Sequence, residues 1–178
     1  MIIKNIEVLI SYLVPKDKEY GNKDFHKIMG LDVSKKHLGI ALSDFSLTLA
    51  FPYKIIVRSA LKADLQLLIS IINQENIKII IIGYPLSLEG KEEGKAQSIR
   101  TFADCLLKEI EVNIYFQDER FSTQFSKNHR IENLSKNLKK GQNLALSRTK
   151  IAINVDDRAA AWFLQAFLDK VKHLKISN

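Results

Sequence analysis

Residues 28–44 read Ile-Met-Gly-Leu-Asp-Val-Ser-Lys-Lys-His-Leu-Gly-Ile-Ala-Leu-Ser-Asp, and this stretch decides the fold. Two apolar segments, 27–34 and 37–44, flank the short Lys35-Lys36 connection, which is the pattern of a β-hairpin. Asp32 interrupts the first segment. A carboxylate among Ile, Leu and Val side chains is costly unless it is paired or binds a cation. The stretch therefore predicts two strands and, at Asp32, a functional residue.

The segments that follow alternate between strand and helix patterns. Residues 47–57 predict a third strand, placed near an edge of the sheet because Pro52 cannot donate a ladder hydrogen bond. Ser59 is expected to cap a helix that reaches about Asn76. The remaining elements are expected in this order: a strand at 77–83, a helix with its apolar stripe at 99–110, a strand at 112–117, and helices at 122–134 and 155–172.

Three strands in hairpin order, followed by alternating helices and strands, predict a mixed α/β sheet with helices on both faces. We expect five strands in the order 3-2-1-4-5, a ribonuclease H-like arrangement. The chain of 178 residues is long enough for one domain with its own core. We assign residues 26–174 to that domain and residues 1–25 to an N-terminal extension and linker.

Composition narrows the class of partner. Lys and Arg number 27 against 20 for Asp and Glu, and the formal net charge of +7 favours a polyanion. The single cysteine, Cys105, cannot form an internal disulfide, and we expect a cytoplasmic location. The apolar segment 6–14 is short and contains Glu7, so we expect neither a signal peptide nor a membrane association.

Three acids far apart in the sequence are expected to point inward at one edge of the sheet. Asp32 shares a strand face with Gly30, which we expect to leave open space beside it. Glu119 follows the fifth predicted strand, at the edge where α/β proteins form their sites. Asp156 lies in the first turn of the last predicted helix, in register with its apolar face.

Carboxylates without His or Cys suit Mg²⁺ or Mn²⁺, and a pair of such ions can promote phosphodiester hydrolysis. Structural roles are the alternative for two of the acids. Asp156 is also explained as an acid favoured at a helix N-terminus, and Glu119 as the ion-pair partner of Arg120.

Four blocks of the sequence resemble the YqgF (RuvX) family of pre-16S rRNA nucleases or Holliday junction resolvases. They are residues 29–44, residues 82–90 with 100–103, Asp118-Glu-Arg-Phe-Ser-Thr123, and Val155-Asp-Asp-Arg-Ala-Ala-Ala-Trp-Phe-Leu-Gln165. The resemblance implies a ribonuclease H-like fold and an acidic triad at Asp32, Glu119 and Asp156. Ser34 departs from the family pattern, which has glycine at that position.

The same resemblance implies a metal-dependent endonuclease, using two Mg²⁺ or Mn²⁺ ions, in the 5′-end maturation of pre-16S rRNA. The expected partner is a structured RNA precursor or branched DNA, bound by a monomer or a homodimer. Basic residues near the triad are expected to hold phosphates: Lys35, Lys36, Arg120, Lys136, Lys139 and Lys140.

Other functions stay open at this point. One is Holliday junction resolution in DNA recombination, and another is a domain that binds nucleic acid without cutting it. A third class, the actin-like and sugar-kinase ATPases, also has a first phosphate loop of the form Asp-x-Gly-Thr/Ser. Those ATPases need two such domains around the nucleotide, for which this chain is too short.

Overall fold

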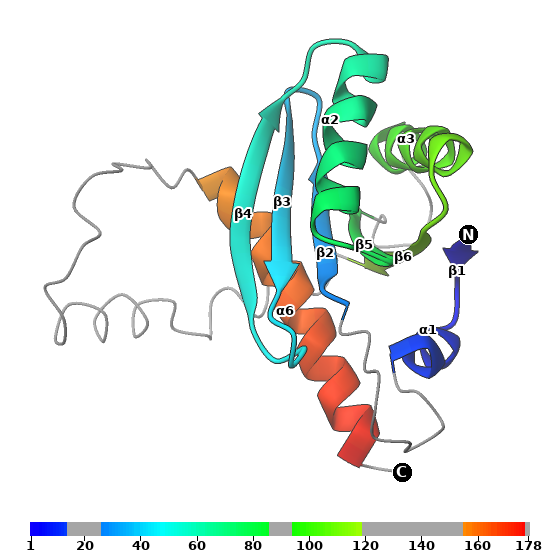
Figure 1. Cartoon of the computed structure of the whole chain (residues 1–178), viewed down its shortest axis with the longest axis vertical. Helices are drawn as coiled ribbons and strands as arrows, with labels where there is room; N and C mark the ends of the chain where they lie inside the picture. The colour runs from blue at the N-terminus through cyan, green and yellow to red at the C-terminus, as the bar shows by residue number, and fades with distance from the viewer. Residues whose placement is uncertain (14–25, 86–93, 119–154, 177–178) are drawn as a thin grey trace, which may run out of the picture.

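A six-stranded sheet runs through the part of the chain that the computed structural model describes, residues 1–13, 26–85, 94–118 and 155–176 (Figure 1). Its strand order is β1-β6-β5-β2-β3-β4. The elements along the chain are β1 (Ile2–Ile3), α1 (Ile6–Leu13), β2 (Ile28–Val33), β3 (His37–Ser43), β4 (Ala50–Val57), α2 (Leu61–Gln74), β5 (Ile79–Tyr84), α3 (Gly94–Glu109), β6 (Asn113–Asp118) and α6 (Val155–Ile176).

The sheet is mixed. Strands β2, β3 and β4 form an antiparallel meander, whereas β5, β6 and β1 continue the sheet in parallel on the other side of β2. The predicted α/β class and the order of the five longer strands are confirmed. The predicted number of strands was too low, because β1 pairs with β6 through Ile2 and Ile3 alone. Two residues show no periodicity from which a strand could be predicted.

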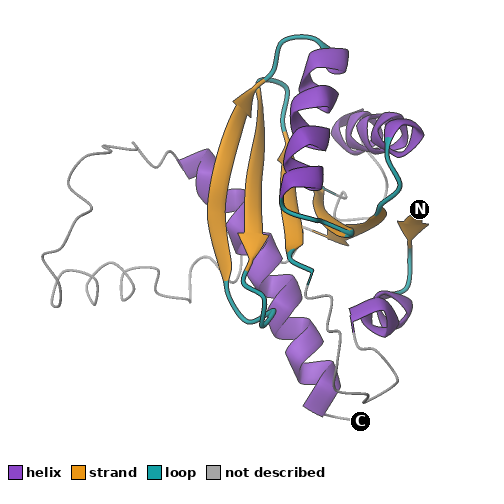
Figure 2. Ribbon diagram, viewed as in Figure 1, coloured by secondary structure: helices purple, strands orange, loops and turns teal. Residues whose placement is uncertain are grey.

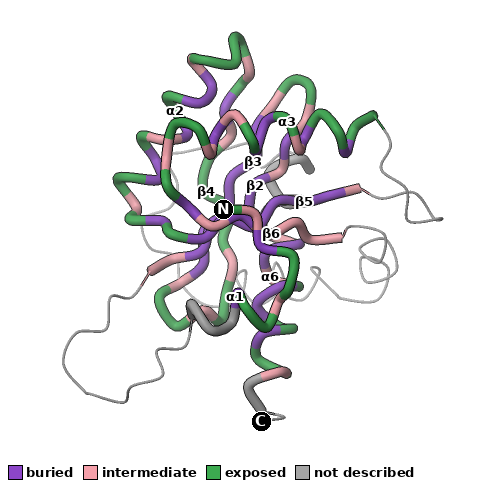
Figure 3. Tube along the Cα trace, turned by 90° about the vertical axis from the view of Figure 1, so that its right-hand side faces the viewer, coloured by how far each residue is buried: buried purple, intermediate pink, exposed green. Residues whose placement is uncertain are grey.

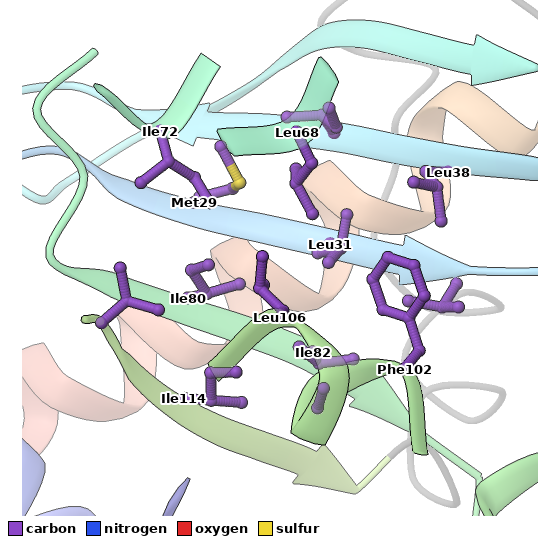
Figure 4. Packing of buried hydrophobic residues seen from close by; sticks show 14 of the residues in the cluster. Met29, Leu31, Leu38, Leu68, Ile72, Ile80, Ile82, Phe102, Leu106 and Ile114 are labelled. Atoms are coloured by element: carbon purple, nitrogen blue, oxygen red, sulfur yellow. The ribbon is translucent and has the colours of Figure 1, made fainter. Parts of the chain in front are cut away.

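Helices cover both faces of the sheet, with α2 and α3 on one face and α6 on the other (Figures 1 and 2). The larger core lies beneath α2 and α3, where Met29 and Leu31 of β2 join Leu68 of α2 and Leu106 of α3 (Figure 4). Within the described residues, none of the helices is both long and apolar enough to cross a bilayer.

The central strands are buried from both sides (Figure 3). Every residue of β5 is buried, and in β2 only Asp32 falls short of full burial. The near-continuous Ile, Leu and Val runs that predicted these strands are explained by this two-sided burial. By contrast, β4 lies at the sheet edge, as Pro52 predicted, and Pro52 itself is exposed.

The turn between β2 and β3 is closed by Ser34. Its hydroxyl accepts the His37 N–H at 3.0 Å and donates to the His37 carbonyl at 2.9 Å, and the Ser34 N–H donates to the same carbonyl at 3.0 Å. Among the described non-glycine residues, only Leu47 and Asn76 have positive φ. The turn therefore does not need the glycine that the family pattern has here, and the serine side chain supplies two of its hydrogen bonds.

Helix α2 starts one residue later than predicted. Its N-cap is Ala60, and Ser59 makes no side-chain cap. Instead the Asp64 carboxylate, in the first turn, accepts the Ser59 N–H at 2.9 Å and the Arg58 Nε–H at 3.1 Å. The side chain of Asp64 is only 2% exposed. The Ser59 prediction was wrong: Ser59 lies before the N-cap, and the Asp64 carboxylate from the first turn binds its N–H.

The backbone of helix α6 contacts β2 at Gly30. A Cβ atom built on Gly30 would lie 2.7 Å from the Ala160 carbonyl oxygen and 2.9 Å from the Leu164 Cβ. The expectation that Gly30 opens space beside Asp32 was wrong, because the helix itself fills that space. Gln165 ties α6 to the sheet a second time: its Oε1 accepts the Ala50 N–H and its Nε2 donates to the Thr48 carbonyl, both at 2.9 Å.

A methyl group at position 30 should therefore force the helix and the sheet apart. We expect Gly30→Ala to lower the free energy of unfolding by about 2 kcal/mol, as overpacked cores do. The measurement is urea unfolding followed by circular dichroism. Gly94→Ala is the matched control, because nothing lies within 4 Å of a Cβ built on Gly94. Equal stability of the two variants would contradict the described contact.

Loss of the Asp64 carboxylate should be costly as well. We expect Asp64→Ala to lower the free energy of unfolding by about 2–3 kcal/mol, since it leaves the partly buried Arg58 guanidinium and the Ser59 N–H without their acceptor. Asp104→Ala, at an exposed position of α3, should change the same quantity by no more than about 0.5 kcal/mol. An Asp64→Ala effect of that small size would show that the pair adds little.

Candidate functional site

Asp32 lies near the carboxyl end of β2, opposite Gly39 of β3. It is partly buried, and by strand alternation it shares a face with Ile28 and Gly30. Ile28 belongs to the core that α6 covers. The predicted strand position and phase of Asp32 are thus confirmed, and its side chain is on the α6 face of the sheet.

The direction of α6 relates Asp156 to Asp32. Figure 1 shows that α6 runs opposite to β2. From Gly30 to Asp32 the strand advances roughly 6.6 Å, and from Ala160 back to Asp156 the helix covers about 6 Å. Because Gly30 and Ala160 are in contact, the backbone of Asp156 in the first turn of α6 lies about level with Asp32.

A third position on this face comes from β6. The pairs Leu31 with Ile82 and Gly83 with Gln117 place Asp32, Gly83 and Gln117 in one row across three neighbouring strands. Gly83, which lies between them in this row, has no side chain to separate the Asp32 and Gln117 positions. The Gln117 Oε1 atom is buried and has no hydrogen-bond partner among the described residues.

Several predicted site residues lie outside the described residues. These are Glu119, Arg120, Lys136, Lys139 and Lys140, together with the predicted helix at 122–134. Asp156 and Asp157 are described by their backbone in α6 but not by their side chains. Glu119 follows Asp118, the last residue of β6, and the parallel pairing of β5 with β6 brings that end to the edge where β2 ends.

The Lys35-Lys36 turn is exposed at the same edge. Arg58, the residue after β4, binds this turn: its Nη1 donates to the Ser34 carbonyl and its N–H to the Lys36 carbonyl, both at 2.8 Å. The pairing of Arg58 with Asp64 orients the guanidinium. Sequence reasoning missed Arg58 and Asp64, although an Arg and an Asp flanking a helix start were visible as a possible pair.

The opposite face of the same edge carries an aromatic cluster. The Tyr84 and Phe116 rings lie 4.5 Å apart between centroids, and the Arg100 guanidinium lies 5.6 Å and 5.3 Å from them. On the α6 face, burial and then the negative charge of Asp118 raise the pKa of Tyr115.

The described residues alone do not complete a metal centre. Within them, no three His, Cys, Asp or Glu side chains gather closely enough to hold an ion. Of the predicted triad, this search reaches only the Asp32 side chain, since Glu119 and the Asp156 side chain are outside the described part. What the described geometry supplies is an edge at which Asp32, Gln117 and the first turn of α6 converge.

Comparison with solved structures bears on the fold. The Thermus thermophilus RuvC chain in the structure "T. thermophilus RuvC in complex with Holliday junction substrate" aligns with a TM-score of 0.51 at 12% sequence identity, covering 82% of this chain and 95% of that one. At this identity the likeness concerns the fold alone, and it agrees with the predicted ribonuclease H-like arrangement.

The sequence matches a known protein family and several named proteins. The profile described as "RuvX: Holliday junction resolvase" matches residues 26–170. A protein of Bartonella quintana (strain Toulouse) named "Putative pre-16S rRNA nuclease" is 34% identical over 174 residues, 98% of this chain and 97% of the relative. One of the same name from Ehrlichia chaffeensis is 34% identical over 173 residues, 97% of each. The chain belongs to the RuvX (YqgF) family.

Proposed function

We propose that this protein is a metal-dependent endonuclease that cleaves phosphodiester bonds in the precursor of 16S rRNA. Family membership supports nuclease chemistry. The two relatives at 34% identity are named after this activity, and the match covers 97% of each of them. The observation that carries the proposal is the contact between Gly30 and the Ala160 carbonyl, which brings the first turn of α6 beside the strand of Asp32.

The donor set supports Mg²⁺ or Mn²⁺ as the cofactor. Asp32, Glu119 and Asp156 would hold the ions through carboxylate oxygens, the ligands these hard cations prefer. The Gln117 oxygen, which is buried and has no hydrogen-bond partner among the described residues, also fits the binding of a cation at this site. Two such ions, when bound, supply water activation and stabilisation of the charge that develops on the scissile phosphate.

The basic residues would bind and orient the substrate. Lys35 and Lys36 are exposed close to Asp32 in the chain, and the Arg58 hydrogen bonds fix the turn that carries them. Both would contact phosphates next to the scissile bond, which sets the register of the substrate without reading its sequence. We assign the same role to Arg120, Lys136, Lys139 and Lys140.

A Holliday junction resolvase is the second candidate, favoured by the description of the matching family profile. Both activities need the same chemistry and differ in substrate shape and in assembly. Two symmetrical cuts in a junction need two sites, hence a homodimer, whereas end processing of RNA can be done by a monomer. We further propose that residues 26–174 form the nuclease domain, that residues 1–25 are an N-terminal extension whose strand β1 joins the sheet of that domain, and that the protein works in the cytoplasm.

Replacing the first acid tests the proposed site. With Mn²⁺ or Mg²⁺ present, we expect Asp32→Asn to reduce cleavage of a 16S rRNA precursor by on the order of a thousand-fold, since loss of a metal ligand removes several kcal/mol of transition-state stabilisation. The measurement is single-turnover cleavage of end-labelled RNA, with a four-way DNA junction alongside. Asp104→Asn, an exposed acid on α3, is the matched control.

Each outcome of this assay has a distinct meaning. Cleavage that survives Asp32→Asn would refute the site. Junction cleavage without RNA cleavage would favour the resolvase, and binding without any cleavage would favour a binding module.

Replacing both turn lysines tests the phosphate contacts. We expect Lys35→Ala/Lys36→Ala to weaken RNA binding and to reduce the slope of log Kd against log salt by about 1.5. A protein that has lost two phosphate contacts releases fewer counterions when it binds. Fluorescence anisotropy over a range of KCl concentrations measures this slope. The control, Lys108→Ala/Lys172→Ala, removes the same charge from exposed positions at the far ends of α3 and α6. An equal change in both variants would rule out a special role for the turn.

A further inference from the structure

Gln117 has a side-chain environment that the proposed triad does not explain. Its Oε1 atom is shielded from solvent and accepts no hydrogen bond from any described residue. A buried acceptor without a donor is unfavourable, because it loses its hydrogen bonds to water and gains no hydrogen bond within the protein. Such an atom in a native fold is explained by an ordered water or an ion, by a catalytic role, or by strain.

The register of three strands shows what the oxygen faces. Gly83 pairs with Gln117, and the β2–β5 register puts Asp32 level with Gly83. All three positions are on the α6 face, since Ile81 and Tyr115, two residues earlier on β5 and β6, pack in the core beneath α6. With no side chain at Gly83, nothing on β5 separates the Gln117 and Asp32 positions on this face.

The chemistry of that space favours a cation over a hydroxyl or amide donor. The carboxylate of Asp32 accepts when ionised, and the backbone of Asp156 enters from α6 at the same level. A donor group of a ligand would contact the Gln117 oxygen alone, whereas a divalent cation can contact this oxygen and the Asp32 carboxylate at once.

We propose that the Gln117 Oε1 atom is a further ligand of the cation bound at Asp32, an inference that rests on the proposed function. An amide oxygen adds coordination without adding negative charge. The three carboxylates of the triad already supply the charge that balances most of two divalent ions. A neutral further ligand would add to the coordination while leaving the ions positive enough to act on a phosphate.

Mn²⁺ binding to the full-length protein without nucleic acid tests this role, measured by isothermal titration calorimetry. We expect Gln117→Met, of similar size but without the amide oxygen, to weaken Mn²⁺ binding by about tenfold. We expect Gln117→Glu, which keeps the oxygen and adds charge, to bind Mn²⁺ more tightly than the parent. Gln66→Met, at an exposed position of α2, is the control and should leave binding unchanged.

The Glu variant also separates a ligand from a residue that merely positions Asp32. If the Gln117 amide acted by donating to the Asp32 carboxylate, a glutamate there would repel Asp32 and weaken Mn²⁺ binding. Weaker binding by Gln117→Glu, or unchanged binding by Gln117→Met, would therefore overturn the proposal.

Metal-free stability gives a second readout that does not depend on activity. Because Gln117→Met removes a buried acceptor without a partner, its melting temperature in EDTA should equal or exceed that of the parent. A lower melting temperature would show that the oxygen is satisfied within the fold and would overturn the proposal. Asp32→Asn separates this proposal from the proposed function. If Asp32→Asn retains full Mn²⁺ binding, the proposed function fails. If Asp32→Asn loses Mn²⁺ binding while Gln117→Met binds Mn²⁺ as the parent does, only the role of Gln117 is refuted.

Discussion

The backbone contact between Gly30 and α6 is the constraint on which the rest of the site depends. A helix separated from a sheet by side chains can be accommodated at several offsets, whereas a helix whose carbonyl oxygen touches the strand has little freedom to slide. Gln165 provides the second fixed point, through the Ala50 N–H and the Thr48 carbonyl. Two fixed points determine both the position and the rotation of α6, so its first turn keeps one place beside the end of β2.

The strand that carries Asp32 is held from its other face as well. Arg58 donates to the Ser34 carbonyl just beyond β2, pairs with Asp64, and lies 5.3 Å from the Phe102 ring centre. A buried ion pair is weak evidence for stability in itself, but here it fixes a backbone position. The end of β2 is thus fixed by a helix backbone on one side and by a guanidinium on the other, which suits a site that must keep its ligands in place.

Much of this arrangement could be predicted from the sequence, because the relevant signals are local. The apolar runs of β2 and β5 predicted two-sided burial, and their order predicted the sheet. What failed depended on contacts distant in sequence: the significance of Gly30 depends on a helix about 130 residues later. The two-residue β1 and the capping role of Asp64 carried no periodic signal. Gln117 could have been noticed by its phase with Glu119, but only strand pairing reveals Gly83 beside it.

Gly30 and α6 touch in the fold but are far apart in the sequence, and this matters while the chain is being synthesised. The β2–β3–β4 meander is built from neighbouring segments and can form while the rest is still being synthesised, because local pairings cost little chain entropy. The helix that packs on Gly30 is Val155–Ile176, which follows the meander only after α2, β5, α3 and β6. A nascent chain that has already folded its meander still lacks this helix, so the protein acquires its site only after α6 has been synthesised.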